Sequence, residues 1–152
     1  MIKSQSDSLI YDQIRGYFVK KSPEEIVRQN ILSNMIKRLG YPKALLCVEK
    51  SLKDLSADNI KRSQIPSRRV DILCYLKKEL KPLLIIECKA EVLSDKTISQ
   101  VIGYNKYVGA PFIAIANMDT ILTGFYDEER KNYRFIKSLP SYEDLSRHAL
   151  VR

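Results

Sequence analysis

The apolar run from Leu83 to Cys88 constrains the fold most, because it carries hydrophobic side chains at consecutive rather than alternate positions. A strand with this pattern is apolar on both faces, and such strands lie inside a sheet that is covered on each side. A second apolar run, Val70 to Leu76, precedes it, and a five-residue polar loop, Lys77 to Lys81, separates the two. Since Pro82 suits the first position of a strand, we expect a central antiparallel hairpin.

The register of this hairpin decides which side chains meet. Residue numbers of paired positions keep a constant sum, which predicts three cross-strand pairs: Tyr75 with Leu83, Leu73 with Ile85, and Asp71 with Glu87. Side chains alternate between faces along a strand, so these residues share one face. Directly opposed Cβ atoms lie about 5 Å apart, and like charges at that spacing destabilise a sheet. Asp71 and Glu87 therefore need a positive charge near them.

Lys89 lies on the same face as Glu87 and can supply part of that charge. Two carboxylates directed at one point also suit a divalent cation, and hard oxygen ligands favour Mg²⁺ or Mn²⁺ over zinc. The alternative is an ion-pair cluster at a strand end. A slip of one residue would move Asp71 to the other face, so the predicted site depends on the register.

Length and composition predict one domain over residues 1–152, because 152 residues with 45% apolar content can build a core. Residues 1–9 are polar, and we expect them to be loose. The chain begins without an apolar signal core and has no apolar stretch of membrane-spanning length, which predicts a cytoplasmic protein without membrane contact. The three cysteines, Cys47, Cys74 and Cys88, lack the paired spacing of a zinc site and are interpreted as reduced core residues.

The net charge of +8 and the pI near 9.4 favour a polyanionic partner, and DNA is the first expectation. Basic pairs occur at Lys61-Arg62, Arg68-Arg69 and Arg130-Lys131. The middle pair lies just before Asp71, where positive charge would suit a scissile phosphate. Each pair taken alone is better explained as part of a solvated face.

A first helix is predicted from Ser22-Pro23 to Gly40, with Ser22 as the N-cap. Arg28 falls within its apolar stripe and must find an anion or extend along its stem to solvent. Its partner is expected to be Glu24 or Glu25, unless Arg28 contacts the functional site directly.

The remaining pattern predicts an α/β fold with a mixed β-sheet flanked by helices. A helix from Ser94 or Asp95 to Val108 carries Gln100 and Tyr104 at positions i and i+4, a spacing that suits a helix face packed on the sheet as well as a functional pair. The other expected elements are a hairpin-like lead-in at 9–20, a strand at 44–48, a loop at 51–67, a strand at 112–116, a hairpin of 121–127 with 133–137, and a C-terminal helical tail within 140–152.

The order of Asp71, a hairpin, Glu87-x-Lys89 and a helix with Gln100-x-x-x-Tyr104 resembles the PD-(D/E)xK nuclease superfamily. The resemblance narrows to the N-terminal nuclease domain of type I restriction enzyme R subunits, in its stand-alone form, over about residues 10–138. The segments that carry it are Ser22–Gln29, Gly40–Lys43, Val48–Lys50, Arg68–Asp71, Ile86–Ala90 and Tyr104–Asn105.

This resemblance implies a restriction-endonuclease-like fold, dependence on Mg²⁺ or Mn²⁺, and cleavage of DNA. It implies that Asp71 and Glu87 hold the metal together with the backbone carbonyl of Cys88. Lys89 would orient or activate the attacking water, while Gln100 and Tyr104 would position DNA or support the site.

Two positions depart from the family pattern. Val70 stands where a proline usually precedes the aspartate. Related nucleases often add a glutamate from the first helix, and here Glu24, Glu25 and Arg28 compete for that place, so no ligand is assigned from it. Arg28, Arg68 and Arg69 remain candidates for DNA contact.

Three functions remain open at this stage. The first is a metal-dependent DNA endonuclease, and the second is a catalytically silent nuclease-fold module that binds DNA or protein. A nuclease for RNA or for branched or modified DNA is the third. R subunits of this type carry an ATP-driven motor, and this sequence lacks G-x-x-x-x-G-K-[ST]. We therefore expect the domain to act alone or with a motor subunit, a specificity subunit or a homodimer partner. The sole histidine, His148, lies in the tail and argues against histidine-dependent hydrolysis.

Overall fold

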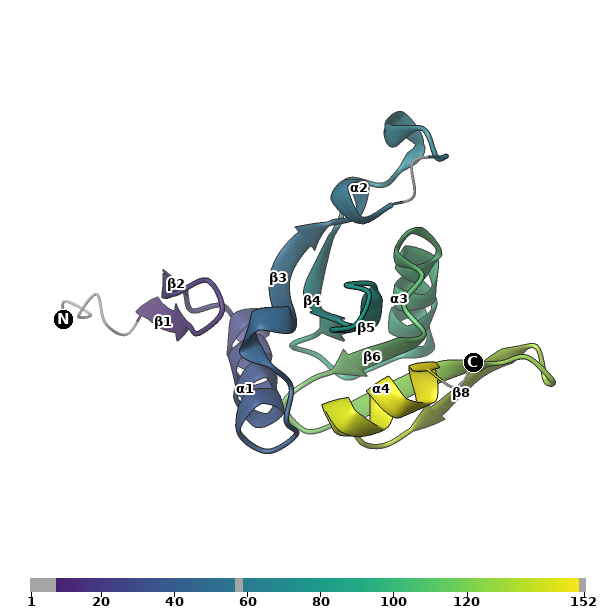
Figure 1. Ribbon diagram of the computed structural model, residues 1–152. Helices are drawn as coiled ribbons and strands as arrows, with labels where there is room; N and C mark the ends of the chain where they lie inside the picture. Colours follow the sequence, from purple (N-terminus) through teal and green to yellow (C-terminus); the bar gives the residue numbers. More distant parts are fainter. Residues whose placement is uncertain (1–7, 57–58, 151–152) are drawn as a thin grey trace.

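The expected hairpin lies inside a six-stranded sheet of the computed structural model, which describes residues 8–56 and 59–150 (Figure 1). The sheet order is β3-β4-β5-β6-β7-β8. The strands are β3 (Leu46–Ser51), β4 (Arg69–Tyr75), β5 (Pro82–Cys88), β6 (Phe112–Ala116), β7 (Ile121–Asp127) and β8 (Asn132–Ile136). The β5–β6 pair is parallel and the other pairs are antiparallel, so the predicted mixed sheet is confirmed.

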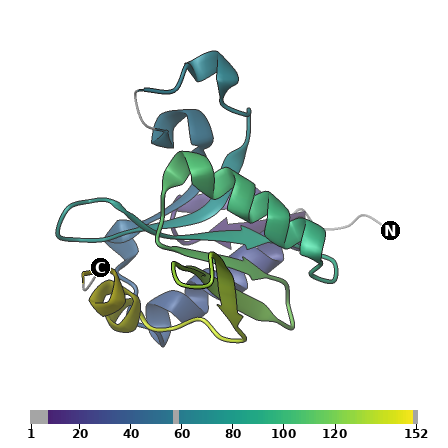
Figure 2. The ribbon, with the colours of Figure 1, turned by 90° about the vertical axis from the view of Figure 1, so that its right-hand side faces the viewer.

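Helices cover both faces of this sheet (Figures 1 and 2). Helices α1 (Pro23–Lys37) and α4 (Tyr142–Leu150) pack on one face, and α3 (Asp95–Val108) packs on the other. Within β5, Leu84 and Ile86 belong to the first core and Ile85 belongs to the second. The consecutive apolar residues of this strand therefore fill two cores at once, as the sequence pattern predicts.

The helix boundaries follow local hydrogen bonds. The Ser22 hydroxyl accepts the Glu25 N–H at the start of α1, and the Ser94 hydroxyl accepts the Thr97 N–H at the start of α3. Gly109, at φ +73°, ends α3 in the left-handed conformation that favours glycine. The predicted start of the first helix and both ends of the second are confirmed, whereas the first helix ends at Lys37, before the expected Gly40.

The segment expected to be a loop at 51–67 contains the short helix α2 (Leu52–Leu55) and a 3-10 turn, Arg62–Gln64. Leu52 is fully buried, so packing orders a segment whose sequence has no clear period. The strand expected at 44–48 is wrong in its bounds, because a 3-10 turn, Lys43–Leu45, occupies its first positions and β3 continues to Ser51.

The expected lead-in hairpin forms a separate two-stranded sheet of β1 (Leu9–Asp12) and β2 (Tyr17–Lys20). Leu9 is thus ordered in a strand, which corrects part of the loose segment expected at 1–9, and residues 1–7 lie outside the described residues. The expected C-terminal helix is α4, and residues 151–152 also lie outside the described part.

Two further observations concern the cysteines and the length of the helices. All three cysteines are free, with Cys74 and Cys88 buried and Cys47 partly exposed. Among residues 8–56 and 59–150, no helix has the length and apolar character needed to cross a membrane.

Truncating the central strand should destabilise the fold strongly. Ile85→Ala removes a side chain that is 1% exposed, and a buried cavity of this kind costs about 2–5 kcal/mol. Leu80→Ala, at a side chain 66% exposed in the β4–β5 loop, is the control and should cost less than about 0.5 kcal/mol. Urea unfolding of both variants measures the difference, and equal midpoints would contradict the two-sided burial of β5.

Candidate active site

The register of the β4–β5 hairpin agrees with the prediction at its centre and departs from it near the loop. Leu73 pairs with Ile85 as expected. Tyr75 pairs with Pro82 rather than with Leu83, because the register shifts by one residue at the end of β4. This shift lies at the loop end of the hairpin, so it does not move the opposite end.

At that opposite end Asp71 and Glu87 come together. Their side chains are hydrogen-bonded to each other, and Asp71 Oδ2 also accepts the backbone N–H of Cys88 at 2.7 Å. The prediction that one register gathers these two carboxyl groups is confirmed. Both side chains are largely buried, with 17% and 13% of their surface exposed.

Burial changes the protonation of this pair. Burial raises the pKa of Asp71, although the Cys88 N–H and Arg28 act in the other direction. Burial, together with the negative charge of Asp71, raises the pKa of Glu87 to about 8. The two carboxyl groups therefore hold a proton between them at neutral pH when no other cation is bound.

Lys89 lies beside the pair, as expected from its spacing. Its Nζ atom is 3.8 Å from Glu87 Oε1, and the side chain is 24% exposed. The backbone N–H of Lys89 donates to the carbonyl of Ala116 at 2.8 Å, which fixes the chain just beyond β5. The ammonium group thus stands at the solvent side of the carboxyl pair.

Arg28 enters the same cluster from α1. Its Nη2 atom is 3.8 Å from Asp71 Oδ1 and also contacts the Glu49 carboxylate, while its Nε atom is 3.3 Å from Glu25 Oε2. Glu25, one of the two expected partners, is thus confirmed as a partner of Arg28. The buried guanidinium also contacts Asp71, while a functional role of Arg28 stays a prediction.

Glu49 is the residue of this cluster that the sequence analysis missed as a site residue. Its neighbours pair across to β4, Val48 with Ile72 and Lys50 with Val70, which sets Glu49 beside Asp71. The pairing of β3 with β4 could have predicted this position of Glu49, but the strand was expected to end at residue 48. Glu49 also has φ +55°, a left-handed conformation that is costly for a residue with a side chain.

Glu24 and Glu25 lie in different environments. Glu24 is exposed, whereas Glu25 is buried and accepts hydrogen bonds from Arg15 at 2.7 Å and from Gln29 at 3.1 Å. With two arginines and an amide on its oxygens, Glu25 supports Arg28 and has little capacity left for a metal.

The other predicted site residues lie outside this cluster. Gln100 and Tyr104 are partly exposed on α3, which covers the sheet face of Ile85, and Tyr104 packs against the core there. In the described part of the chain neither side chain is hydrogen-bonded to the carboxyl pair. Arg68 and Arg69 are exposed at the start of β4, and neither forms an ion pair among the described residues.

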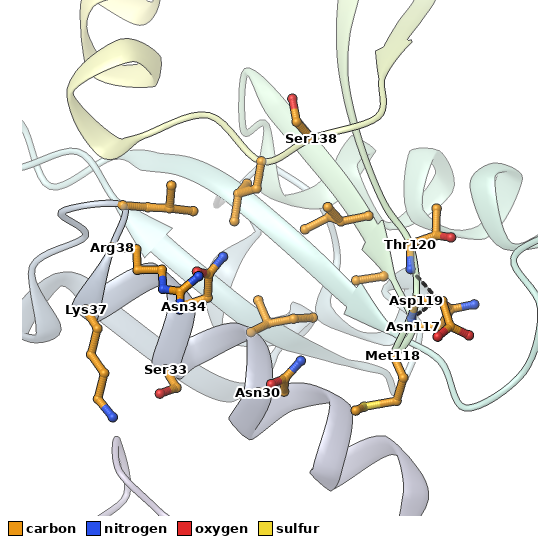
Figure 3. Close-up of a pocket in the computed structure, with 15 residues that line it drawn as sticks. Asn30, Ser33, Asn34, Lys37, Arg38, Asn117, Met118, Asp119, Thr120 and Ser138 are labelled. Carbon is orange, nitrogen blue, oxygen red and sulfur yellow. Dashed lines mark hydrogen bonds between the residues drawn. The ribbon is translucent and has the colours of Figure 1, made fainter.

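An open groove of about 710 Å³ lies between α1 and the turn that joins β6 to β7 (Figure 3). Polar side chains of α1 form one wall: Asn30, Ser33, Asn34, Lys37 and Arg38. The facing wall is the Asn117–Thr120 turn, in which Asn117 Oδ1 accepts the N–H groups of Asp119 and Thr120. Asn117 Nδ2 donates to the carbonyl of Glu91 at 3.1 Å, so this wall is tied to the segment that follows Lys89.

The donor set at the carboxyl pair fits a hard divalent cation. Among the described residues, no group of three or more His, Cys, Asp or Glu side chains is arranged around one point for a metal. Asp71 and Glu87 nevertheless present hydrogen-bonded oxygens where a cation can replace their proton, and the backbone carbonyl of Cys88 is adjacent. Mg²⁺ is commonly bound through one or two carboxylates with water completing its shell.

Residues 23–140 match the family described as type I restriction enzyme R protein N terminus. The chain belongs to this family. The expected relationship to R-subunit N-terminal domains is thereby confirmed, and it includes α1, the β4–β5 hairpin and α3.

A solved structure supports the fold of this R-protein N-terminal domain. The chain is similar to a fragment assigned as an HsdR subunit of a type I restriction enzyme from Vibrio vulnificus YJ016, with a TM-score of 0.58 and 16% identity. The similarity covers 82% of this chain and 25% of that chain. A comparison with curated proteins gives no match.

The metal-free domain should lose stability as the pH rises from about 5 towards 8. The ordinary pKa of Glu87 is 4.5 and its value in the fold is about 8, so between these values the folded state holds a proton that the unfolded chain has lost. The stabilisation from this group is full below the lower value and disappears as the pH passes the upper one. Urea unfolding in EDTA at several pH values measures this slope.

Glu87→Gln should flatten that slope by on the order of 1 kcal/mol or more across the window. Glu79→Gln, in the exposed β4–β5 loop, is the matched control and should keep the wild-type slope. Identical slopes in all three proteins would mean that Glu87 is ionised throughout.

Proposed function

We propose that this chain is a PD-(D/E)xK nuclease domain that hydrolyses DNA phosphodiester bonds with Mg²⁺ or Mn²⁺. The observation that carries the proposal is the buried contact between Asp71 and Glu87 with Lys89 beside it. Like-charged side chains that meet at a strand end are unfavourable for the fold. A cation-binding role explains why they are there.

In this proposal Asp71, Glu87 and the Cys88 carbonyl hold the cation. When bound, the cation would neutralise charge on the phosphate and lower the pKa of an attacking water. The Cys88 N–H fixes one oxygen of Asp71, which orients the other oxygen. Preorganisation of this kind limits the reorganisation needed during the reaction.

Lys89 is proposed to hold the nucleophilic water and to donate to the phosphate. Its ammonium group is near Glu87 but remains partly exposed, so it can reach an incoming substrate. Arg28 is a positioning residue, because it contacts Asp71 and is itself held by Glu25 and Glu49. Gln100 and Tyr104 are proposed to contact DNA from α3, on the same side of the sheet as Glu87.

The groove between α1 and the β6–β7 turn is proposed to take the DNA backbone. Lys37 and Arg38 are exposed in its α1 wall, and neither forms an ion pair in the described part of the chain. The polar line from Asn30 to Arg38 extends roughly 12 Å along the helix. Lys37, Arg38, Arg68 and Arg69 are proposed to contact phosphates, in line with the polyanionic partner that the net charge of +8 favours.

A catalytically silent module that binds DNA or protein is the second candidate. Arg28 favours it, because its guanidinium is 3.8 Å from Asp71 and already offsets part of the charge that would attract a metal. The chain also spans about a quarter of the structural relative. We propose that a motor subunit, a specificity subunit or a homodimer partner presents the DNA to the domain.

Lys89→Ala should lower the rate of plasmid cleavage by about 10²–10⁴-fold while the affinity for Mn²⁺ changes little, because it removes a proton-transfer and orienting group rather than a ligand. Asp71→Ala and Glu87→Ala should lose both cleavage and Mn²⁺ binding. Cleavage assays and calorimetry measure the two effects, and Lys78→Ala, in the loop at the far end of the hairpin, should retain both.

Undiminished cleavage by Asp71→Ala or Lys89→Ala would disprove the assigned site. If the wild-type domain binds DNA but neither binds Mn²⁺ nor cleaves DNA, the silent module is the correct function.

Replacing Lys37 and Arg38 together by alanine should weaken DNA binding, and the loss should be greatest at low salt. Loss of two phosphate contacts should reduce the slope of log affinity against log salt by about 2. Fluorescence anisotropy with a labelled duplex at several salt concentrations measures this slope. Alanine at Lys77 and Lys78 removes the same charge from the far end of the sheet, so an equal effect there would show that only net charge matters.

A further inference from the structure

The β1–β2 hairpin exposes large apolar side chains to solvent. Tyr11 is 49% exposed, Phe18 is 63% exposed and Leu9 is 43% exposed. Exposed apolar side chains scattered singly need no explanation, but a contiguous group of them marks an interaction site. The hairpin therefore has an apolar surface that remains exposed among the described residues.

These side chains share one face of the two-stranded sheet. Tyr11 pairs with Phe18, and Leu9 pairs with Lys20 two positions further along each strand. The Tyr11 and Phe18 rings meet edge to face, with centroids 5.3 Å apart. We call the four side chains of Leu9, Tyr11, Phe18 and Lys20 the aromatic face.

The hairpin that presents this face is held in a defined shape. Asp12 is fully buried, and its Oδ1 atom accepts the N–H groups of Ile14 at 2.8 Å and Arg15 at 3.0 Å. Gly16, at φ +78°, donates its N–H to the Asp12 carbonyl and closes the turn. A rigid platform binds with a smaller loss of conformational entropy than a flexible one.

Ion pairs connect this platform to the candidate active site. Arg15 contacts Asp12 within the hairpin and is 2.7 Å from Glu25 Oε1 on α1. Glu25 in turn contacts Arg28, which contacts Asp71. Figure 1 shows the β1–β2 hairpin beside α1, the helix that carries Arg28.

We propose that the aromatic face stacks unpaired bases of a DNA strand that continues from the cleavage site. This inference rests on the proposed function for the identity of the polymer and adds its structural class, DNA with a single-stranded segment. Aromatic rings bordered by cations are the usual platform for unpaired bases, because every base has a π-face and every linkage has a charge.

The charge of the surroundings favours DNA over a protein surface as the occupant. Lys20 belongs to the face and Lys21 follows it, and both are exposed without an ion pair among the described residues. In the described part of the hairpin the one carboxylate, Asp12, is buried against Arg15. A strand of phosphates matches this pattern of rings with free positive charge.

The test compares three labelled DNAs in EDTA by fluorescence anisotropy, so that binding is measured without cleavage. They are a blunt duplex, the same duplex with a single-stranded tail, and the duplex with an abasic tail of equal length. Wild-type protein should prefer the tail with bases over the abasic tail by about fivefold or more, the low end of stacking on an aromatic side chain. The tail carries 2-aminopurine in a second experiment, and its fluorescence should fall on binding.

Two variants separate stacking from other contacts. Phe18→Leu keeps an apolar side chain but removes the ring, so the preference for the tail with bases should shrink, while Phe18→Tyr should retain it. Leu80→Ala, at an exposed apolar residue of the β4–β5 loop, should bind all three DNAs as the wild type does. Thermal unfolding of each variant verifies that the domain is intact.

Equal affinity for the tail with bases and the abasic tail would overturn the inference. It would also be overturned if Phe18→Leu changed self-association in sedimentation but left the tail preference unchanged, because the face would then bind a second copy of the chain. The proposed nuclease function fails on a different measurement, the absence of metal-dependent cleavage, so the two failures are distinguishable.

Discussion

The ion pairs of the buried Arg28 guanidinium hold together the cluster of acidic side chains at the candidate site. Arg28 comes from the apolar stripe of α1 and contacts carboxylates from three elements, Glu25, Glu49 and Asp71. Its Nη1 atom has no hydrogen-bond partner among the described residues. A buried charge of this kind is stable only with paired counter-charges, and those counter-charges hold the helix to the end of the sheet.

This arrangement explains how a small domain tolerates several acids at one strand end. The positive charge of Arg28 offsets part of the negative charge of Asp71, and Lys89 lies beside Glu87 on the solvent side. The Asp71–Glu87 pair still holds a proton near neutral pH. The position filled by that proton is the one that a stronger cation would take. Loss of Arg28 would leave the acids in stronger mutual repulsion, because removing one partner of a buried ion pair is more harmful than replacing the whole pair.

Much of this architecture could be predicted from the sequence, because it follows from features that are local in the chain, the apolar pattern of each strand and the length of each loop. The two-sided burial of Leu83–Cys88 fixed the sheet centre, and the loop length fixed the pairing of Leu73 with Ile85. Tyr75 was misplaced because a bulge is not visible in an apolar pattern. Glu49 was missed because its role depends on β3 pairing with β4, a contact between segments separated by a polar stretch.

The position of Glu87 at the end of a fully covered central strand has a consequence for the lifetime of the site. Amide groups of β5 are bonded on both sides, to β4 and to β6, so their exchange with solvent requires most of the sheet to open. The β1–β2 sheet pairs with no other strand in the described part of the chain and meets α1 through side chains. Exchange of backbone amides with solvent should therefore be slow at Glu87 and faster at Arg15, so one network of ion pairs joins two regions of different local stability.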